Sequence, residues 1–121
     1  MQPVLNPGRY VFVTLPSDQS LDLHYIIASV REPEGLSVVL TEHDAAQFGF
    51  PASYLAAWIS LTVQSDLAAV GFTAGFSNAL AQAGISCNVV AGNHHDHLFV
   101  PHDQAHLAME VLRALQSRAA V

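Results

Sequence analysis

The same order of short elements occurs twice along this chain of 121 residues. The segment from Leu36 to Asp44 resembles the segment from Leu98 to Asp103, because in each an apolar strand pattern leads into a helix pattern through a His-Asp pair. Each half is too short to bury its own sheet face. We therefore expect the two halves to share one continuous sheet that is covered by helices.

The first half is predicted to hold three short strands and one helix. The cluster Asn6–Gly8 consists of turn formers and predicts a turn before the first strand. The Pro and Gly of residues 32–35 favour a hairpin, and Thr41 is the expected N-cap of the helix. Residues 21–27 fit either a short helix or an irregular crossing. The predicted ranges are strands at 9–15, 26–31 and 36–40 and a helix at 42–48.

The second half carries clearer signals. Apolar residues recur at spacings of three and four over its longest helical pattern, for which Ser65 and Asp66 are the expected N-cap residues. Gly84 stands where a helix ends with a residue in the left-handed conformation. The predicted ranges are strands at 54–63, 85–91 and 96–100 and helices at 67–83 and 102–117.

The charge balance excludes several classes of function. Four basic residues, all Arg, stand against ten Asp and Glu, which gives a net charge of −6. Without clustered basic residues we expect no nucleic-acid binding, and without Lys the chain cannot use a phosphate-binding lysine or a Schiff base. The apolar runs are shorter than the roughly 18–20 residues of a membrane span, and the N-terminus lacks the pattern of a secretion signal.

Neither candidate nucleophile fits a catalytic arrangement. Cys87 is the only cysteine, lies among apolar residues of a predicted strand, and is expected to be a core residue of a cytoplasmic protein. Ser77 lies inside the predicted long helix and lacks the second glycine of a nucleophile elbow. The chain is therefore not expected to be an enzyme.

Five of the seven histidines lie between His94 and His106. Strand alternation puts His95 and His97 on one side, and helical spacing puts His102 and His106 on one face. Either pair could bind a divalent metal through neutral imidazoles. The alternative is a polar turn followed by a solvated helix start, in which these histidines bond backbone groups.

Two stretches of the second half resemble a known family. Trp58–Ala74 and Leu80–Gly92 resemble an ACT domain, in which a strand, a glycine-containing loop and a helix precede an Ala-Gly-Ile joint into the next strand. From about Pro7 to Leu115, the chain is similar to small bacterial stand-alone proteins built from tandem ACT-like units. The motifs that carry this similarity include Gly-Ile-Ser-Cys-Asn-Val-Val-Ala-Gly and His-Asp-His-Leu-Phe-Val-Pro near the end of the chain.

The resemblance implies an α+β, ferredoxin-like tandem with an antiparallel sheet and helices packed on one side. It implies a first, degenerate ACT-like unit at 7–50 and a second, complete βαββα unit at 54–118, packed as one compact domain. It also implies a homodimer around sites for a small polar metabolite, usually an amino acid. The only charged residue between Asp44 and Asp96 is Asp66, which fits a core and an interface between copies.

The ligand site implied by the resemblance lies at the joint between strand and long helix. Backbone N–H groups and a helix N-terminus favour a carboxylate there, although Asp66 would oppose that charge if the helix began beside it. The loop lacks the proline of the usual Asp-x-Pro-Gly pattern. Asn88 could bond the ligand or a second copy, or it could be a strand residue that pairs with a neighbouring loop. The candidate binding residues are Gln64, Ser65, Asp66, Leu67, Val70, Gly71, Phe72, Thr73 and Asn88.

Three functional hypotheses follow from these patterns. The first is a non-enzymatic regulatory or sensing module that binds a small polar metabolite, most simply an amino acid, without a cofactor. The second is a metal-binding protein or metal-dependent hydrolase centred on His95 and His97. The third is a structural interaction module that binds no small ligand.

Overall fold

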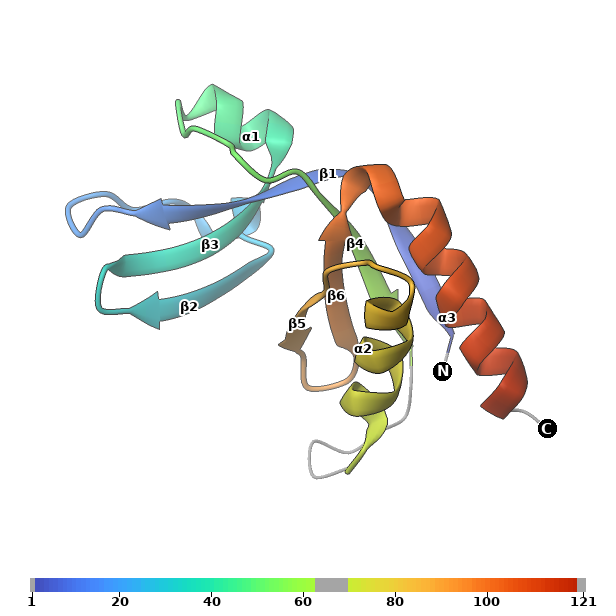
Figure 1. The fold of residues 1–121 in the computed structure, drawn as a ribbon. Helices are drawn as coiled ribbons and strands as arrows, with labels where there is room; N and C mark the ends of the chain where they lie inside the picture. Colours follow the sequence, from blue (N-terminus) through green and yellow to red (C-terminus); the bar gives the residue numbers. More distant parts are fainter. Residues whose placement is uncertain (1, 63–69, 120–121) are drawn as a thin grey trace. The chain divides into compact units, whose positions relative to one another are not determined.

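The chain forms two compact units. The computed structural model describes residues 2–62 and 70–119. The first unit is Gly8–Ala56, and the second unit combines Met1–Pro7 with Ala57–Val121. The strands are hydrogen-bonded in the order β2-β3-β1-β4-β6-β5. Strand β1 (Pro3–Leu15) therefore contributes its first residues to the second unit and its remainder to the first unit (Figure 1).

The first unit is a three-stranded antiparallel sheet with one short α-helix. Strand β3 (Gly35–Thr41) pairs with both β1 and β2 (Ala28–Glu32), and α1 (Glu42–Gln47) follows β3 directly. The crossing between β1 and β2 contains the 3-10 turn η1 (Leu23–Tyr25). The residues that alternate onto one face of the sheet form the core with α1: Val11, Val13, Leu15, Val38, Leu40 and Ala45.

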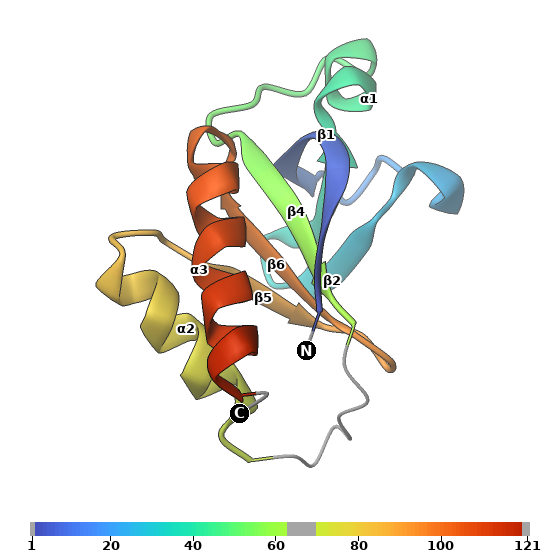
Figure 2. The ribbon, with the colours of Figure 1, turned by 90° about the vertical axis from the view of Figure 1, so that its right-hand side faces the viewer.

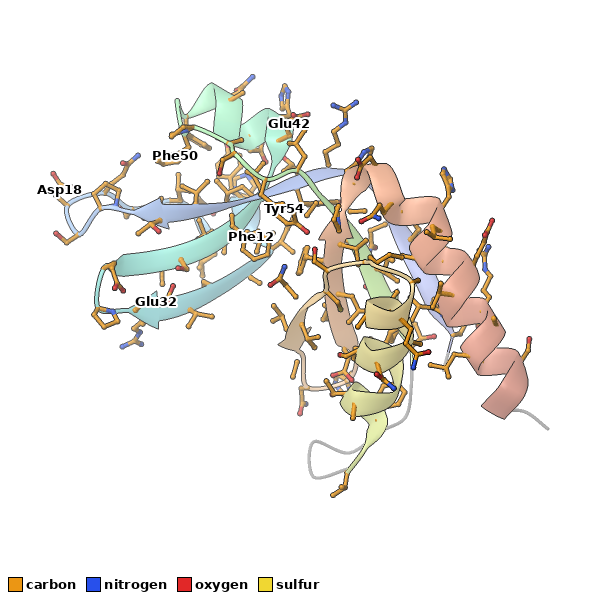
Figure 3. The ribbon with its side chains drawn as sticks, in the orientation of Figure 1. Phe12, Asp18, Glu32, Glu42, Phe50 and Tyr54 are labelled. Atoms are coloured by element: carbon orange, nitrogen blue, oxygen red, sulfur yellow. The ribbon has the colours of Figure 1, made fainter. Side chains whose placement is uncertain are left out.

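Aromatic side chains lie at the edges of this core. Phe12 alternates onto the opposite face of β1, where its ring lies 6.3 Å from the ring of Tyr54, centroid to centroid (Figure 3). Tyr25 makes an edge-to-face contact with Phe48 at 5.0 Å, and Phe48 is followed by Phe50, which packs against the core. Tyr25 and Phe50 thus add to the core beside the six-residue helix, whereas Phe12 lies on the opposite face of the sheet.

The second unit has four strands and two long helices. Its sheet runs in the order β1, β4 (Ala56–Leu61), β6 (Asp96–Pro101) and β5 (Asn88–Ala91). Helices α2 (Phe72–Gln82) and α3 (Ala105–Ala119) lie side by side over one face, and the 3-10 turn η2 (His102–Gln104) leads into α3 (Figures 1 and 2). The core between sheet and helices includes Ile59, Leu61, Phe76, Leu80, Leu98, Val100, Met109 and Leu112.

The predicted fold class is confirmed. The chain is an α+β protein with an antiparallel sheet, and the strand order of the second unit is that of a ferredoxin-like fold. The hairpin at residues 32–35 and the Thr41 cap are confirmed too, because the Thr41 hydroxyl accepts a hydrogen bond of 3.1 Å from the Asp44 N–H. Helix α2 ends as expected before Gly84, whose φ is +76°.

Three local predictions were wrong. The cluster Asn6–Gly8 forms no turn but lies within β1, since the first residues of the chain pair with β4. The long helix begins at Phe72 and not at residue 67, because Gly71 takes a left-handed φ of +90° that a continuing helix does not allow. Strand β5 begins only at Asn88, because Ile85 turns into the core beneath the helices.

Within residues 2–62 and 70–119, no helix has the length and apolar character needed to span a bilayer. The boundaries 7–50 and 54–118, and the packing of both halves into a single compact domain, stay predictions.

Candidate functional site

The start of α2 is the described part of the predicted ligand site. Gly71 is the N-cap residue, and among the residues described by the structure no side chain caps this end. No acidic residue lies in the first turn. The first N–H groups of a helix have no intrahelical acceptor and carry a partial positive charge. This end of α2 is therefore suited to an anionic group such as a carboxylate.

Four neighbouring residues of the predicted site lie at this helix end. Val70 is almost fully exposed, at 98%, and precedes the N-cap. Phe72 anchors the helix start, because its ring contacts the buried Phe76 ring at 5.2 Å and packs against the core. Thr73, in contrast, is exposed. The structure thus brings Val70, Gly71, Phe72 and Thr73 together at one corner.

The remaining loop residues of the prediction, Gln64, Ser65, Asp66 and Leu67, lie outside the described residues. The prediction that Ser65 and Asp66 cap the long helix is nevertheless wrong, because Gly71 holds the N-cap position. Asp66 precedes Phe72, the first helical residue, by six positions in the sequence.

Asn88 lies away from this corner. It is the first residue of β5, is exposed, and follows the C-cap residue Ala83 by five positions. Helix α2 has 11 residues and is therefore about 16 Å long. Both ribbon views show the chain entering β5 near the end of α2 and not near its start (Figures 1 and 2). Within one copy, Gly71 therefore lies at the start of α2, whereas Asn88 lies near its other end.

A polar network that the sequence did not predict occupies the sheet face opposite the helices. Along β4, Ala57, Ile59 and Leu61 face the core, so Trp58 and Ser60 face the other way. The Trp58 indole Nε1 donates to Nδ1 of His97 at 3.1 Å, and the Ser60 hydroxyl lies 3.1 Å from the same nitrogen. The Trp58 ring also stacks on Phe99, with centroids 6.2 Å apart.

Asn6 ties the first strand to this network. Its Nδ2 donates to the Ser60 hydroxyl at 3.0 Å and to the Trp58 carbonyl at 3.2 Å. Three strands of the second unit thus meet through Asn6, Trp58, Ser60 and His97. Of these residues only His97 had been singled out from the sequence, since its partners lie 37 and 39 positions away.

The network defines the state of His97. An indole N–H can only donate a hydrogen bond, so Nδ1 of His97 is an acceptor and the ring proton lies on Nε2. Burial lowers the pKa of His97 below its ordinary value, the neighbouring His95 lowers it further, and Asp96 acts in the opposite direction. His97 is therefore a neutral imidazole at pH 7.

These contacts do not favour the metal hypothesis. His95 is exposed in the turn before β6, whereas Nδ1 of His97 faces two hydrogen-bonding partners. A side chain in place of Gly92 would put its Cβ 3.2 Å from Nε2 of His97, so the residue beside the other ring nitrogen has to be small. In the described part of the chain, no three His, Cys, Asp or Glu side chains group as metal ligands.

Cys87 is half-buried, and burial raises the pKa of its thiol to about 11. A thiol with that pKa carries almost no thiolate at neutral pH and is a poor nucleophile. Its contacts with the core match the structural role expected from the sequence.

Comparison with protein-family models gives two matches, both described as ACT domain. One covers residues 1–57 and the other covers residues 55–114. Comparison with curated proteins finds no match.

Solved structures give three informative neighbours. A Vibrio cholerae protein of unknown function, described as a possible transport protein, is 45% identical over 92% of this chain and 86% of its own, with a TM-score of 0.82. An aspartokinase with alpha and beta subunits is 13% identical over 97% and 98% of the two chains, with a TM-score of 0.68. The regulatory subunit of aspartate kinase from Thermus flavus is 14% identical over 95% and 97%, with a TM-score of 0.63.

Proposed function

The chain belongs to the ACT domain family, and from this premise we propose that it is a non-enzymatic regulatory or sensing module that binds a small molecule. The observation that carries the proposal is the start of α2, where Gly71 leaves the first helical N–H groups without a side-chain cap among the described residues. The fold likeness to a regulatory subunit of aspartate kinase supports a regulatory role over a catalytic one.

The proposed ligand is an amino acid or a similar small polar metabolite with a carboxylate. The carboxylate would accept hydrogen bonds from the N–H groups at the start of α2, where the helix dipole favours negative charge. Gln64, Ser65, Asp66 and Leu67 remain part of the proposed site, and Asp66 would be available to pair with the ligand ammonium. The metal hypothesis lacks this kind of support and is set aside.

We also propose that the protein is a homodimer. The charge-poor stretch between Asp44 and Asp96 suits the centre of an interface between copies. Since Asn88 lies at the far end of α2 from Gly71, its proposed contact is with the second copy or with a ligand held between copies. Light scattering at micromolar concentration is expected to give twice the chain mass, and a monomer mass would contradict this proposal. A cytoplasmic location, indicated by the single cysteine, remains a prediction.

A thermal-shift panel of the twenty amino acids tests the proposed ligand class. A ligand present at 100 times its dissociation constant adds about 2.7 kcal/mol to the stability of the protein that binds it. At least one amino acid is expected to raise the melting temperature. If none does so with correctly folded protein, the amino-acid proposal fails, and a dimer without any ligand response would favour the interaction module instead.

A matched pair of variants tests the location of the site. Thr73→Asp places a negative charge in the first turn of α2, and Thr73→Asn has nearly the same shape without the charge. Because Thr73 is exposed, both variants are expected to fold. Thr73→Asp should lose the ligand-induced shift and Thr73→Asn should keep it. An equal shift in both variants would place the carboxylate elsewhere.

A further inference from the structure

We propose that His97 is a pH-sensitive contact within the second unit: proton uptake at its Nδ1 detaches the Trp58 indole and reverses the hydrogen bond between His97 and Ser60. This proposal is independent of any ligand. It rests on the hydrogen-bond geometry of Trp58, Ser60 and Asn6 around one imidazole nitrogen.

The first step follows from the donors at Nδ1. The neutral ring offers a lone pair there, which accepts the Trp58 N–H at 3.1 Å. A protonated ring carries hydrogen on both nitrogens, so two N–H groups would face each other across that distance. The hydrogen bond between β4 and β6 is lost as a result, and the indole must move relative to the imidazolium.

The second step passes through Ser60. Its hydroxyl accepts from Asn6 at 3.0 Å and can donate to the neutral His97 ring at 3.1 Å. Next to an imidazolium, Ser60 can only accept, so its own hydrogen must turn away from Nδ1. The two lone pairs of the Ser60 oxygen can then accept from the Asn6 amide and from the imidazolium. Protonation of His97 therefore reverses the direction of its hydrogen bond with Ser60, while the Asn6 bond between β1 and β4 is kept.

Among the described residues of the second unit, few charged groups surround His97. The first strand up to Pro7, β4, β5 and α2 contain no ionisable residue. On β6 itself, Asp96 favours the imidazolium, and His95 in the preceding turn disfavours it. Helix α3 carries His106, Glu110 and Arg113, which are exposed, and packs on the other face of the sheet. Titration of the network thus depends on His97 and its two sequence neighbours.

Tryptophan fluorescence provides a direct readout, because Trp58 is the only tryptophan of the chain. The emission of the full-length protein is recorded from pH 8 to pH 5 while far-UV circular dichroism confirms that the fold persists. We expect a single transition with a midpoint below 6.5, the ordinary pKa of histidine. A flat emission profile over this range would overturn the proposal.

Two variants identify the titrating group. His97→Asn keeps an acceptor oxygen near the position of Nδ1 but cannot titrate, so its emission should stay flat. His106→Gln removes an exposed histidine of α3 and should keep the wild-type transition. A transition that persists in His97→Asn, or that disappears in His106→Gln, would refute the assignment to His97.

A second measurement does not require that His97→Asn folds. Proton NMR follows the titration of the His97 ring in the wild type and in Trp58→Phe, a variant that removes the indole donor but keeps an aromatic ring. The hydrogen bond from the indole stabilises the neutral ring, so the titration midpoint of His97 should rise in this variant. A midpoint that stays unchanged would show that the Trp58 bond does not hold His97 neutral.

Discussion

Gly35 is a residue at which the backbone allows almost no other side chain. Its φ is +142°, and a Cβ atom there would lie 2.5 Å from the backbone oxygen of Leu15. The neighbour is backbone of the paired strand region and cannot rotate away. The Pro-Glu-Gly sequence that leads into β3 and ends at its first residue predicted the turn, but only the structure places Leu15 against Gly35.

Gly35→Ala is therefore expected to destabilise the protein by about 1–3 kcal/mol, the cost of a strained backbone position. The measurement is urea unfolding at neutral pH. Gly75→Ala is the matched control, because Gly75 lies within α2 and a Cβ there meets nothing within 4 Å. The control should be neutral or stabilising by up to about 1 kcal/mol. Equal losses in both variants would contradict the steric explanation.

The stability of the protein should also depend on pH through His97. The pKa of His97 is lowered in the folded state, so as the pH falls the unfolded chain takes up this proton first. The contribution of neutral His97 to the free energy of unfolding is fully present above pH 6.5 and is lost as the pH falls through the folded-state pKa.

Urea unfolding at pH 7.5 and pH 5.5 checks this expectation. The wild type should lose more stability over that interval than His97→Asn, which has no titrating group at the position. The difference between the two losses isolates His97 from the other histidines. A larger loss of stability in His97→Asn than in the wild type would contradict the expected direction of the pH dependence.

At the scale of elements, the sequence located most helices and strands but not all of their ends. Local sequence signals predicted a helix end correctly where that end depends on hydrogen bonds between neighbouring residues. Examples are the Thr41 cap of α1 and the last turn of α2 before Gly84. Local signals failed at the start of α2, where Ser65 and Asp66 offered a cap signal but the left-handed Gly71 is the N-cap. A backbone dihedral is not encoded in residue type alone.

Thr41→Ala should remove the cap of α1 and destabilise the first unit by about 1 kcal/mol. Thr41→Ser keeps the hydroxyl that accepts the Asp44 N–H and should lose only a small part of that stability. The quantity compared is the midpoint of urea unfolding. If Thr41→Ser is as unstable as Thr41→Ala, the methyl group and not the hydroxyl carries the effect.

At the scale of the whole molecule, the largest departure from expectation is the pairing of the first residues with β4. The backbone carbonyl oxygen of Gln2 accepts hydrogen bonds from the N–H and from the hydroxyl of Thr62, both at 3.0 Å. Leu5 packs against the core of the second unit. These partners are about sixty positions apart in the chain. A pairing between residues so far apart produces no local pattern in the sequence. For the same reason the sequence did not predict the network of Asn6, Trp58 and Ser60.

Deletion of residues 2–7 should expose the edge of β4 and destabilise the second unit selectively. Hydrogen exchange should speed up at backbone amides of β4 and stay slow at the β2–β3 hairpin, which pairs within the first unit. Asn6→Ala, which removes only the side-chain bonds, should give a smaller increase. Equal acceleration in both units would mean that the segment stabilises the chain as a whole.

The division of β1 between two units has a consequence for protein engineering. No single cut in the chain yields a second unit with all four of its strands, because the residues of its first strand precede the first unit in the sequence. A circular permutant that places residues 2–7 after α3 would reunite them. Fusion partners and split reporters should accordingly be attached without displacing that leading segment.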